Sequence, residues 1–316
     1  MKEKLRNYFA FSEGGMNNTL AASRWSFLKF LSFVFPPMLT FFFLQDVLNG
    51  NIRQTFFYMG ILIVIALVMF LILTKEYKMT YDVTYQESTQ LRIDLANKLK
   101  ELPLSYFSTH NLSDLSQTVM MDVSNTEMVI SHAVPAGIGF AGFFTLMTIL
   151  MCMSNLILGL TVTVPIWLGI ATMFLLKRIQ LSGVKKYYNK LLDNSNAFQE
   201  AFEMQQEIKS YSMQDQVRSD VEEKLESTEW IHLKAEVGLG LLNFLIGILP
   251  YLAPVLTATV GAGLYLSGSI NILYYVGYLM AATTLSSQFS AVSEYLLMIF
   301  FFETSFRRIG ELKNEP

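Results

Sequence analysis

The sequence predicts an all-α integral membrane protein with six membrane-spanning helices. Of its 316 residues, 52% are hydrophobic and only 16% are charged, whereas an average soluble domain has about 25% charged residues. Several long stretches contain no Asp, Glu, Lys or Arg, and a helix needs about 20 apolar residues to cross the hydrocarbon layer. The charged connections between these stretches have helical rather than strand patterning. Composition and charge spacing therefore both favour a bundle of helices in lipid.

The charge-free stretches place six spans in order along the chain. The first two are separated by the short turn Asn49-Gly50-Asn51. Residues 128–176 are too long for one crossing and suit two spans joined at Ser154-Asn155, while residues 237–293 are broken by the Gly/Ser/Asn turn at 267–271. The predicted spans are residues 26–48, 55–74, 128–153, 156–177, 237–264 and 270–302.

The positions of lysine and arginine orient these spans. If the N-terminus is cytoplasmic, Arg53 is the only one of the 23 Lys and Arg residues that lies in an outer connection. Because short cytoplasmic loops carry the excess of positive charge in membrane proteins, we expect both termini in the cytoplasm. Residues 1–25 are then a cytoplasmic N-terminal helix, with Arg24 and Trp25 at the depth of an interfacial helix.

The two inner connections, residues 75–127 and 178–236, are long and regular. They are rich in Glu, Gln, Lys, Leu and Ala and contain one proline, Pro103, which favours helix. Each connection therefore predicts a pair of helices of about 25 residues that continue the spans and, at 1.5 Å per residue, project roughly 40 Å into the cytoplasm.

The residues needed for several other chemistries are missing. The sequence contains no Gly-x-x-x-x-Gly-Lys-Ser/Thr, so this chain alone is not expected to hydrolyse ATP. Cys152 is the only cysteine and the three histidines are scattered, which predicts neither a disulfide nor a metal site. A formal charge of −3 gives no basic field for nucleic acid.

Three segments carry a family resemblance. Leu102 to Leu115 contains Leu-Pro, an aromatic pair and Asp-Leu, and it is followed by Asp122-Val123. Glu200 to Tyr211 begins with glutamate and has a lysine nine residues later, and Arg308-Ile309-Gly310-Glu311-Leu312 lies near the C-terminus. In these segments the chain resembles the transmembrane domain of ABC transporters of the exporter fold (ABC transmembrane type 1).

The resemblance covers the whole chain and implies how it works. Two such domains, identical or related, form one transport path, and ATPase domains, fused or separate, bind ATP and Mg and push on two cytoplasmic turns. Residues 305–316 would lead to the ATPase domain, and this chain would bind no cofactor itself. Ser113 and Glu203 depart from the family by replacing glycine. The residues implied to contact the ATPase domain are Tyr106, Phe107, Ser108, Asn111, Asp114, Leu115, Glu200, Phe202, Glu203, Gln206, Lys209 and Tyr211.

Polar residues inside the predicted spans are candidates for the substrate path, because polar groups are costly in lipid and face the interior of a bundle. Asn243, Gln288 and Glu294 are these candidates. Glu294 is the only ionisable one, and the alternative for it is a position in water at the inner boundary of the membrane. None of the three names a substrate, which is expected to be a small molecule, a lipid or a peptide.

The predicted function is that of the permease half of an ATP-driven transporter, in a bacterial plasma membrane. An ion-coupled carrier or channel would need more ionisable residues within the spans, and a membrane scaffold that binds a soluble partner through the long inner helices is the third class. Within the transporter prediction, Phe11-Ser12-Glu13-Gly14-Gly15 resembles the start of a bacterial branch that includes siderophore importers, and siderophore-type import is therefore an alternative to export.

Overall fold

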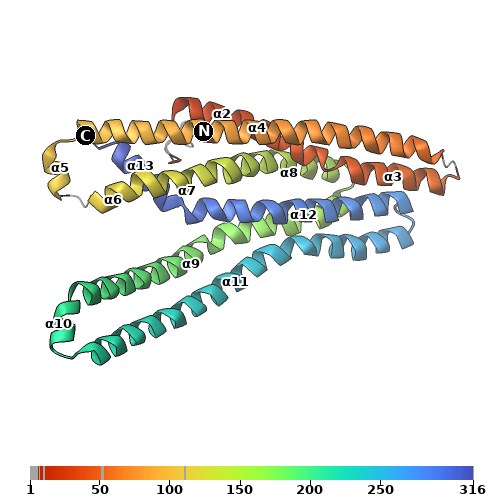
Figure 1. The fold of residues 1–316 in the computed structure, drawn as a ribbon. Coiled ribbons are helices and arrows are strands. Elements are labelled where there is room, and N and C mark those ends of the chain that lie inside the picture. The colour runs from red at the N-terminus through yellow and green to blue at the C-terminus, as the bar shows by residue number, and fades with distance from the viewer. Residues whose placement is uncertain (1–5, 7, 10, 51–52, 110–111, 316) are drawn as a thin grey trace. The chain divides into compact units, whose positions relative to one another are not determined.

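The computed structural model describes the backbone of residues 6, 8–9, 11–50, 53–109 and 112–315, and these residues form helices and turns without a strand (Figure 1). They divide into two compact units, Met1–Trp167 with Pro250–Pro316, and Leu168–Leu249. The helices are α2 Glu13–Ser32, α3 Phe35–Leu48, α4 Thr55–Glu101, α5 Leu104–Thr109, α6 Leu112–Gln117, the π-helix η1 Thr118–Asp122, α7 Val123–Met128, the π-helix η2 Val129–Ala133, α8 Val134–Ser154, α9 Leu156–Glu203, α10 Gln205–Ser210, α11 Gln214–Leu266, α12 Ile272–Phe301 and α13 Glu303–Lys313.

The prediction of an all-α membrane protein is confirmed. In the described part of the chain, five helical stretches are long and apolar enough to cross a membrane, and α12 with α13, bent by 43° at their junction, makes a possible sixth. The five stretches are Gly14–Leu48, Thr55–Glu101, Leu115–Ser154, Leu156–Ile179 and Gln214–Leu266.

Three helices are much longer than a membrane is thick. The helices α4, α9 and α11 have 47, 48 and 53 residues, so each extends about 70–80 Å at 1.5 Å per residue, against a hydrocarbon layer of about 30 Å. The predicted spans therefore continue without a break into the long connections. We call residues 75–127 the first long hairpin and residues 178–236 the second.

The N-terminal part differs from the expected division into residues 1–25 and 26–48. Helix α2 begins after Ser12, whose Oγ accepts a hydrogen bond from the Gly15 N–H at 2.9 Å, and it runs unbroken past residue 25 to Ser32. It packs against both α4 and α8. The chain breaks at Phe33-Val34 instead, directly before Pro36-Pro37, because proline has no N–H to continue the helix.

Side chains of α12 satisfy backbone carbonyls that lack a helical partner at the end of α2 and at Pro250 in α11. The N–H of Val34 bonds to Leu31 at the break, and the Phe30 carbonyl accepts a hydrogen bond from Gln288 Nε2 at 3.4 Å. In α11, Pro254 lacks the N–H that would reach the Pro250 carbonyl, which accepts from Ser286 Oγ at 2.6 Å instead. Bent helices persist in lipid where neighbouring groups replace the lost partners in this way.

Replacing Ser286 with alanine is expected to lower the free energy of unfolding by about 1–3 kcal/mol, because the buried Pro250 carbonyl would lose its donor. Thermal unfolding of the purified protein measures the effect. Thr283→Ala on the same helix is the control, since the Thr283 hydroxyl is exposed and bonds only to carbonyls of its own helix. Equal unfolding temperatures for the two variants would show that the Ser286 bond to the Pro250 carbonyl does not stabilise the protein.

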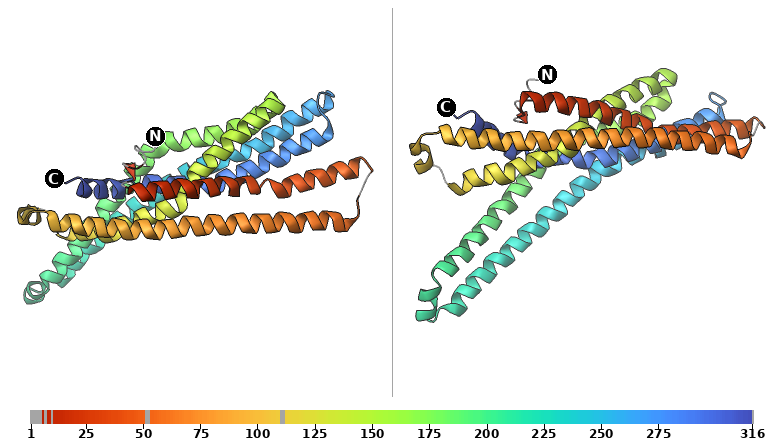
Figure 2. Two further views of the ribbon diagram at one scale, coloured as in Figure 1. Left: turned by 90° about the horizontal axis from the view of Figure 1, so that it is seen from above. Right: turned by 45° about the horizontal axis from the view of Figure 1, so that its top comes forward.

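The second unit contains α9 from Leu168 onward, the short α10, and α11 up to Leu249. The two long helices lie side by side through the second long hairpin in all three views (Figures 1 and 2). Asn194 and Thr228 are buried between them, and the Thr228 hydroxyl donates to Asn194 Oδ1 at 3.1 Å. This buried polar pair fixes the register of one arm of the hairpin against the other.

Candidate functional site

The turn of the first long hairpin is formed by α5 and α6. Pro103 follows the end of α4, and its carbonyl accepts from the Tyr106 N–H at 2.9 Å, which starts the short α5. Tyr106 and Phe107 are half-buried, with ring centroids 5.8 Å apart. They pack, together with Leu115, against a buried cluster of Leu91, Leu95, Leu102, Val123, Ile309 and Leu312. Both aromatic rings are thus partly buried within this chain.

Other residues of the first turn are more available to a partner. Leu104 is 88% exposed and Leu112 is 63% exposed. Ser108 is exposed, but its hydroxyl donates to the Ser105 carbonyl of its own helix. Asn111 lies outside the described residues, as does the side chain of Asp114, whose backbone belongs to α6. Leu104 and Leu112 were not predicted from the sequence, although leucines that flank a proline-bounded turn are a signal for exposed apolar contacts.

The turn of the second long hairpin exposes its aromatic residues almost fully. Phe202 is 72% exposed, Tyr211 is 76% exposed, and Met204 between them is 48% exposed. The chain reverses at Ser212, which adopts a left-handed φ of 55°. Glu200, Gln206 and Lys209 are also exposed, and Glu203 accepts a hydrogen bond from Gln199 Nε2 at 2.8 Å.

The two turns therefore differ in chemistry. At the second turn Phe202, Met204 and Tyr211 are exposed large apolar side chains in an otherwise polar hairpin. At the first turn the corresponding aromatic residues are packed inward. Burial raises the pKa of the Tyr106 phenol above its ordinary value of 10, and the nearby Glu315 carboxylate raises it further. The Tyr106 side chain is therefore a neutral hydrogen-bonding group at physiological pH.

Of the candidate path residues, Gln288 and Glu294 belong to the first unit and Asn243 to the second. Asn243 is exposed on the part of α11 that belongs to the second unit. Gln288 is 8% exposed and supports the break after α2, so the structure gives it an architectural contact. Its Oε1 has no hydrogen-bond partner in the described structure.

The residue next to Glu294 belongs to a row of ring contacts that joins three helices. This residue, Tyr295, stacks on His132 with centroids 6.0 Å apart, and His132 meets Tyr81 at 5.7 Å. Tyr81 lies more than one helical turn beyond Glu76, which pairs with Lys29 at 3.0 Å just past the charge-free part of α4. Glu294 is exposed, and the contacts of its neighbour Tyr295 lead through His132 to Tyr81 in the charged part of α4.

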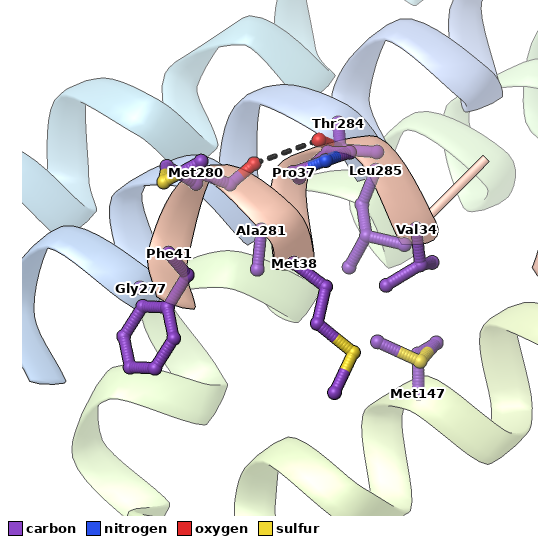
Figure 3. A pocket seen from close by; sticks show the side chains of 10 residues that line it. All are labelled: Val34, Pro37, Met38, Phe41, Met147, Gly277, Met280, Ala281, Thr284 and Leu285. Atoms are coloured by element: carbon purple, nitrogen blue, oxygen red, sulfur yellow. Dashed lines mark hydrogen bonds between the residues drawn. The ribbon is translucent and has the colours of Figure 1, made fainter. Parts of the chain in front are cut away.

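A methionine-rich cavity of 150 Å³ lies between α3, α8 and α12 (Figure 3). Figure 3 shows Phe41, Met38, Met147 and Met280 around it, and the only hydroxyl, that of Thr284, donates to the Met280 carbonyl at 2.8 Å. Flexible methionine side chains suit apolar ligands of varied shape. The sequence analysis did not predict this site, because its residues come from three helices and none is polar or charged enough to stand out. The lining residues are Val34, Pro37, Met38, Phe41, Met147, Gly277, Met280, Ala281, Thr284 and Leu285.

Comparison with known families assigns residues 25–291 to the ABC transporter transmembrane region. No curated protein matches the chain. The match covers well over half of the sequence and agrees with the long apolar helices, which confirms the resemblance to this family; the C-terminal segment at residues 308–312 lies outside the matched range. The chain belongs to the family of ABC transporter transmembrane regions and is an integral, multi-pass membrane protein of the transport machinery.

Proposed function

We propose that this chain is one permease half of an ATP-driven transporter and that its two long hairpins receive movement from ATPase domains. The observation that carries the proposal is the exposed group Phe202, Met204 and Tyr211 at the turn of an otherwise polar hairpin, in a chain of the ABC transmembrane family. Lys and Arg residues lie in the hairpins and near both termini, whereas the outer connections contain only Arg53. This distribution supports a cytoplasmic position for the hairpins and for both termini. The membrane proposed is the bacterial plasma membrane.

The proposed mechanism is mechanical. ATP and Mg bind to the ATPase domains, and closure of these domains pushes on Tyr106 to Leu115 and on Glu200 to Tyr211. A second transmembrane domain, identical or related, completes the path. ATP binding then favours one of two packing states of the helix bundle, and a substrate shifts this equilibrium only by its different affinity for the two states.

The substrate class proposed is an apolar or amphipathic molecule with an apolar part that fits the methionine-rich cavity. Its lining of Met, Phe, Val and Leu side chains, with the Thr284 hydroxyl bonded to its own helix, supports this class. Import of a siderophore-type compound is supported only by the resemblance of residues 11–15. Part of that segment has a local role, since Ser12 and Gly15 both contact Glu87.

The nucleotide dependence of access to the cavity tests this function without knowledge of the substrate. Thr284→Cys in a Cys152→Ala background, within the complete transporter, is labelled in sealed vesicles with a membrane-impermeant maleimide from either side. ATP is expected to change the ratio of the labelling rates from the two sides about tenfold. This corresponds to a change of about 1.4 kcal/mol in the free-energy difference between the two states. The control is Ser269→Cys, at the short turn before α12. This cysteine should be labelled from the same side of the membrane with and without ATP.

The rival functions predict other results in the same vesicles. An ion-coupled carrier would change its labelling with an ion or proton gradient and not with ATP. A scaffold would respond to neither. Labelling that ignores ATP in the complete transporter would overturn the proposed function.

A further inference from the structure

A buried carboxylate joins the last helix to the first long hairpin. Asp122 closes the π-helix η1 and is 4% exposed. Its Oδ1 accepts a hydrogen bond from Ser305 Oγ of α13 at 2.8 Å, and its Oδ2 lies 3.7 Å from Arg308 Nη1. Asn125 Nδ2 also donates to Ser305 Oγ at 3.3 Å. Because Oδ2 has no hydrogen-bond partner in the described structure, Arg308 is the group that compensates its charge.

Apolar contacts surround this polar group on the same helix. Ile309 is fully buried and Leu312 is 4% exposed, and both belong to the cluster that contains Leu91 and Leu95 of α4 and Val123 of α7. The apolar face of α13 thus shares one core with both arms of the first long hairpin. Figure 1 shows α13 beside the start of α7 and the end of α4.

Helix α13 also packs against the preceding span, because Phe306 is 2% exposed and shares a cluster with Met298 and Ile299 of α12. Helix α12 ends at Phe301, and α13 starts at Glu303 after a 43° bend. The contacts of α13 with the first long hairpin are the apolar core that contains Ile309 and Leu312 and the pair between buried Asp122 and half-exposed Arg308. Helix α13 therefore packs on the first long hairpin as well as on the last span.

We propose that Asp122 is a positioning residue that fastens α13 to the first long hairpin, so that the hairpin receives movement through α13 as well as through its own turn. This inference rests on the proposed function and on the expectation from the sequence that residues 305–316 lead to an ATPase domain. It explains why the aromatic residues of the first turn are packed inward: Tyr106 and Phe107 lie against the same cluster as Ile309 and Leu312. They transmit force within the chain, whereas the second turn presents its rings to a partner.

Two neighbouring arginines on α13 provide a matched test in the complete transporter. Arg308 faces Asp122, whereas Arg307 is 70% exposed and pairs at 3.6 Å with Glu311 of its own helix. Arg308→Gln is expected to speed amide hydrogen exchange in residues 303–313 and 118–122 by about tenfold, because it weakens a local contact between the two segments. The ATP-dependent labelling shift at Thr284→Cys should fall about fivefold, with the rate of ATP hydrolysis within about twofold of wild type. Arg307→Gln should change neither readout.

Asp122→Asn provides a second variant that keeps the shape of the side chain and its bond from Ser305. If Asp122 and Arg308 act through one contact, the double variant exchanges no faster than the more affected single variant. Equal effects of Arg307→Gln and Arg308→Gln, or a loss of ATP hydrolysis in step with the labelling shift, would overturn the positioning role. Failure of the wild-type protein to show any labelling shift would instead contradict the proposed function, and hydrogen exchange would still test the contact.

Discussion

Replacing Phe202 and Tyr211 together with alanine is expected to lower ATP-driven movement of the permease about 100-fold or more without changing its thermal unfolding. Both rings are more than 70% exposed, so their removal takes little from the fold. If each ring is buried in an ATPase domain, its transfer from water contributes about 1.5–3 kcal/mol to that contact. The labelling shift at Thr284→Cys and the rate of ATP hydrolysis, measured in the same vesicles, report the loss.

A single exposed leucine on the arm of the same hairpin is the control for this variant. Leu225 is 37% exposed on α11, and Leu225→Ala should leave the labelling shift unchanged. An alanine pair at Tyr106 and Phe107 should instead lower both the shift and the unfolding temperature, because those rings also pack in the core of the first hairpin. If the Phe202 and Tyr211 pair behaves like Leu225, the second turn does not receive the ATPase domain.

The second large effect is expected at Gly15, where alanine should lower the free energy of unfolding by about 3 kcal/mol or more. The buried carboxylate of Glu87, 4% exposed, accepts hydrogen bonds from both the N–H and the Oγ of Ser12 at 2.6 Å. A Cβ on Gly15 would overlap this carboxylate. Displacing it would break two hydrogen bonds to a charged group, each worth about 1.5–3 kcal/mol, at the positive end of α2.

Gly14 provides the comparison for Gly15, one position earlier in the same turn. A Cβ on Gly14 would meet only Ser12 Oγ, at an ordinary 3.8 Å, and alanine is favoured over glycine in a helix by about 1 kcal/mol. Gly14→Ala should therefore be neutral or stabilising in thermal unfolding, whereas Gly15→Ala should unfold at a clearly lower temperature. If both variants are equally stable, Glu87 does not hold the start of α2.

The long helices could be predicted from the sequence because each of their signals is local. Helix α4 combines a charge-free run with a polar segment of good helix formers, and nothing in residues 55–101 interrupts it. The path of α2 could not be predicted in the same way. Glu87 lies in a polar run and looks exposed in the sequence, and only its contact with Ser12, 75 residues away, makes it a buried partner of that helix.

The same limit applies to the candidate coupling turns. Tyr106 and Phe202 both stand beside helix ends in polar hairpins, and the sequence treats them alike. Their burial differs because Ile309 and Leu312, about 200 residues later, complete a core under Tyr106, while Phe202 remains 72% exposed. Gln288 was predicted for the substrate path because it is polar, but its amide supports a backbone carbonyl released at a break in another helix.

The central claim is that ATP changes the side from which the membrane cavity is reached, and Thr284→Cys labelling in the nucleotide-trapped transporter tests it most directly. Trapping the complete transporter with ATP and vanadate should give labelling from the side opposite the long hairpins and protect the cysteine on the hairpin side. Removal of nucleotide should reverse this preference. The same preferred side in both states, with Ser269→Cys labelled normally, would contradict the account.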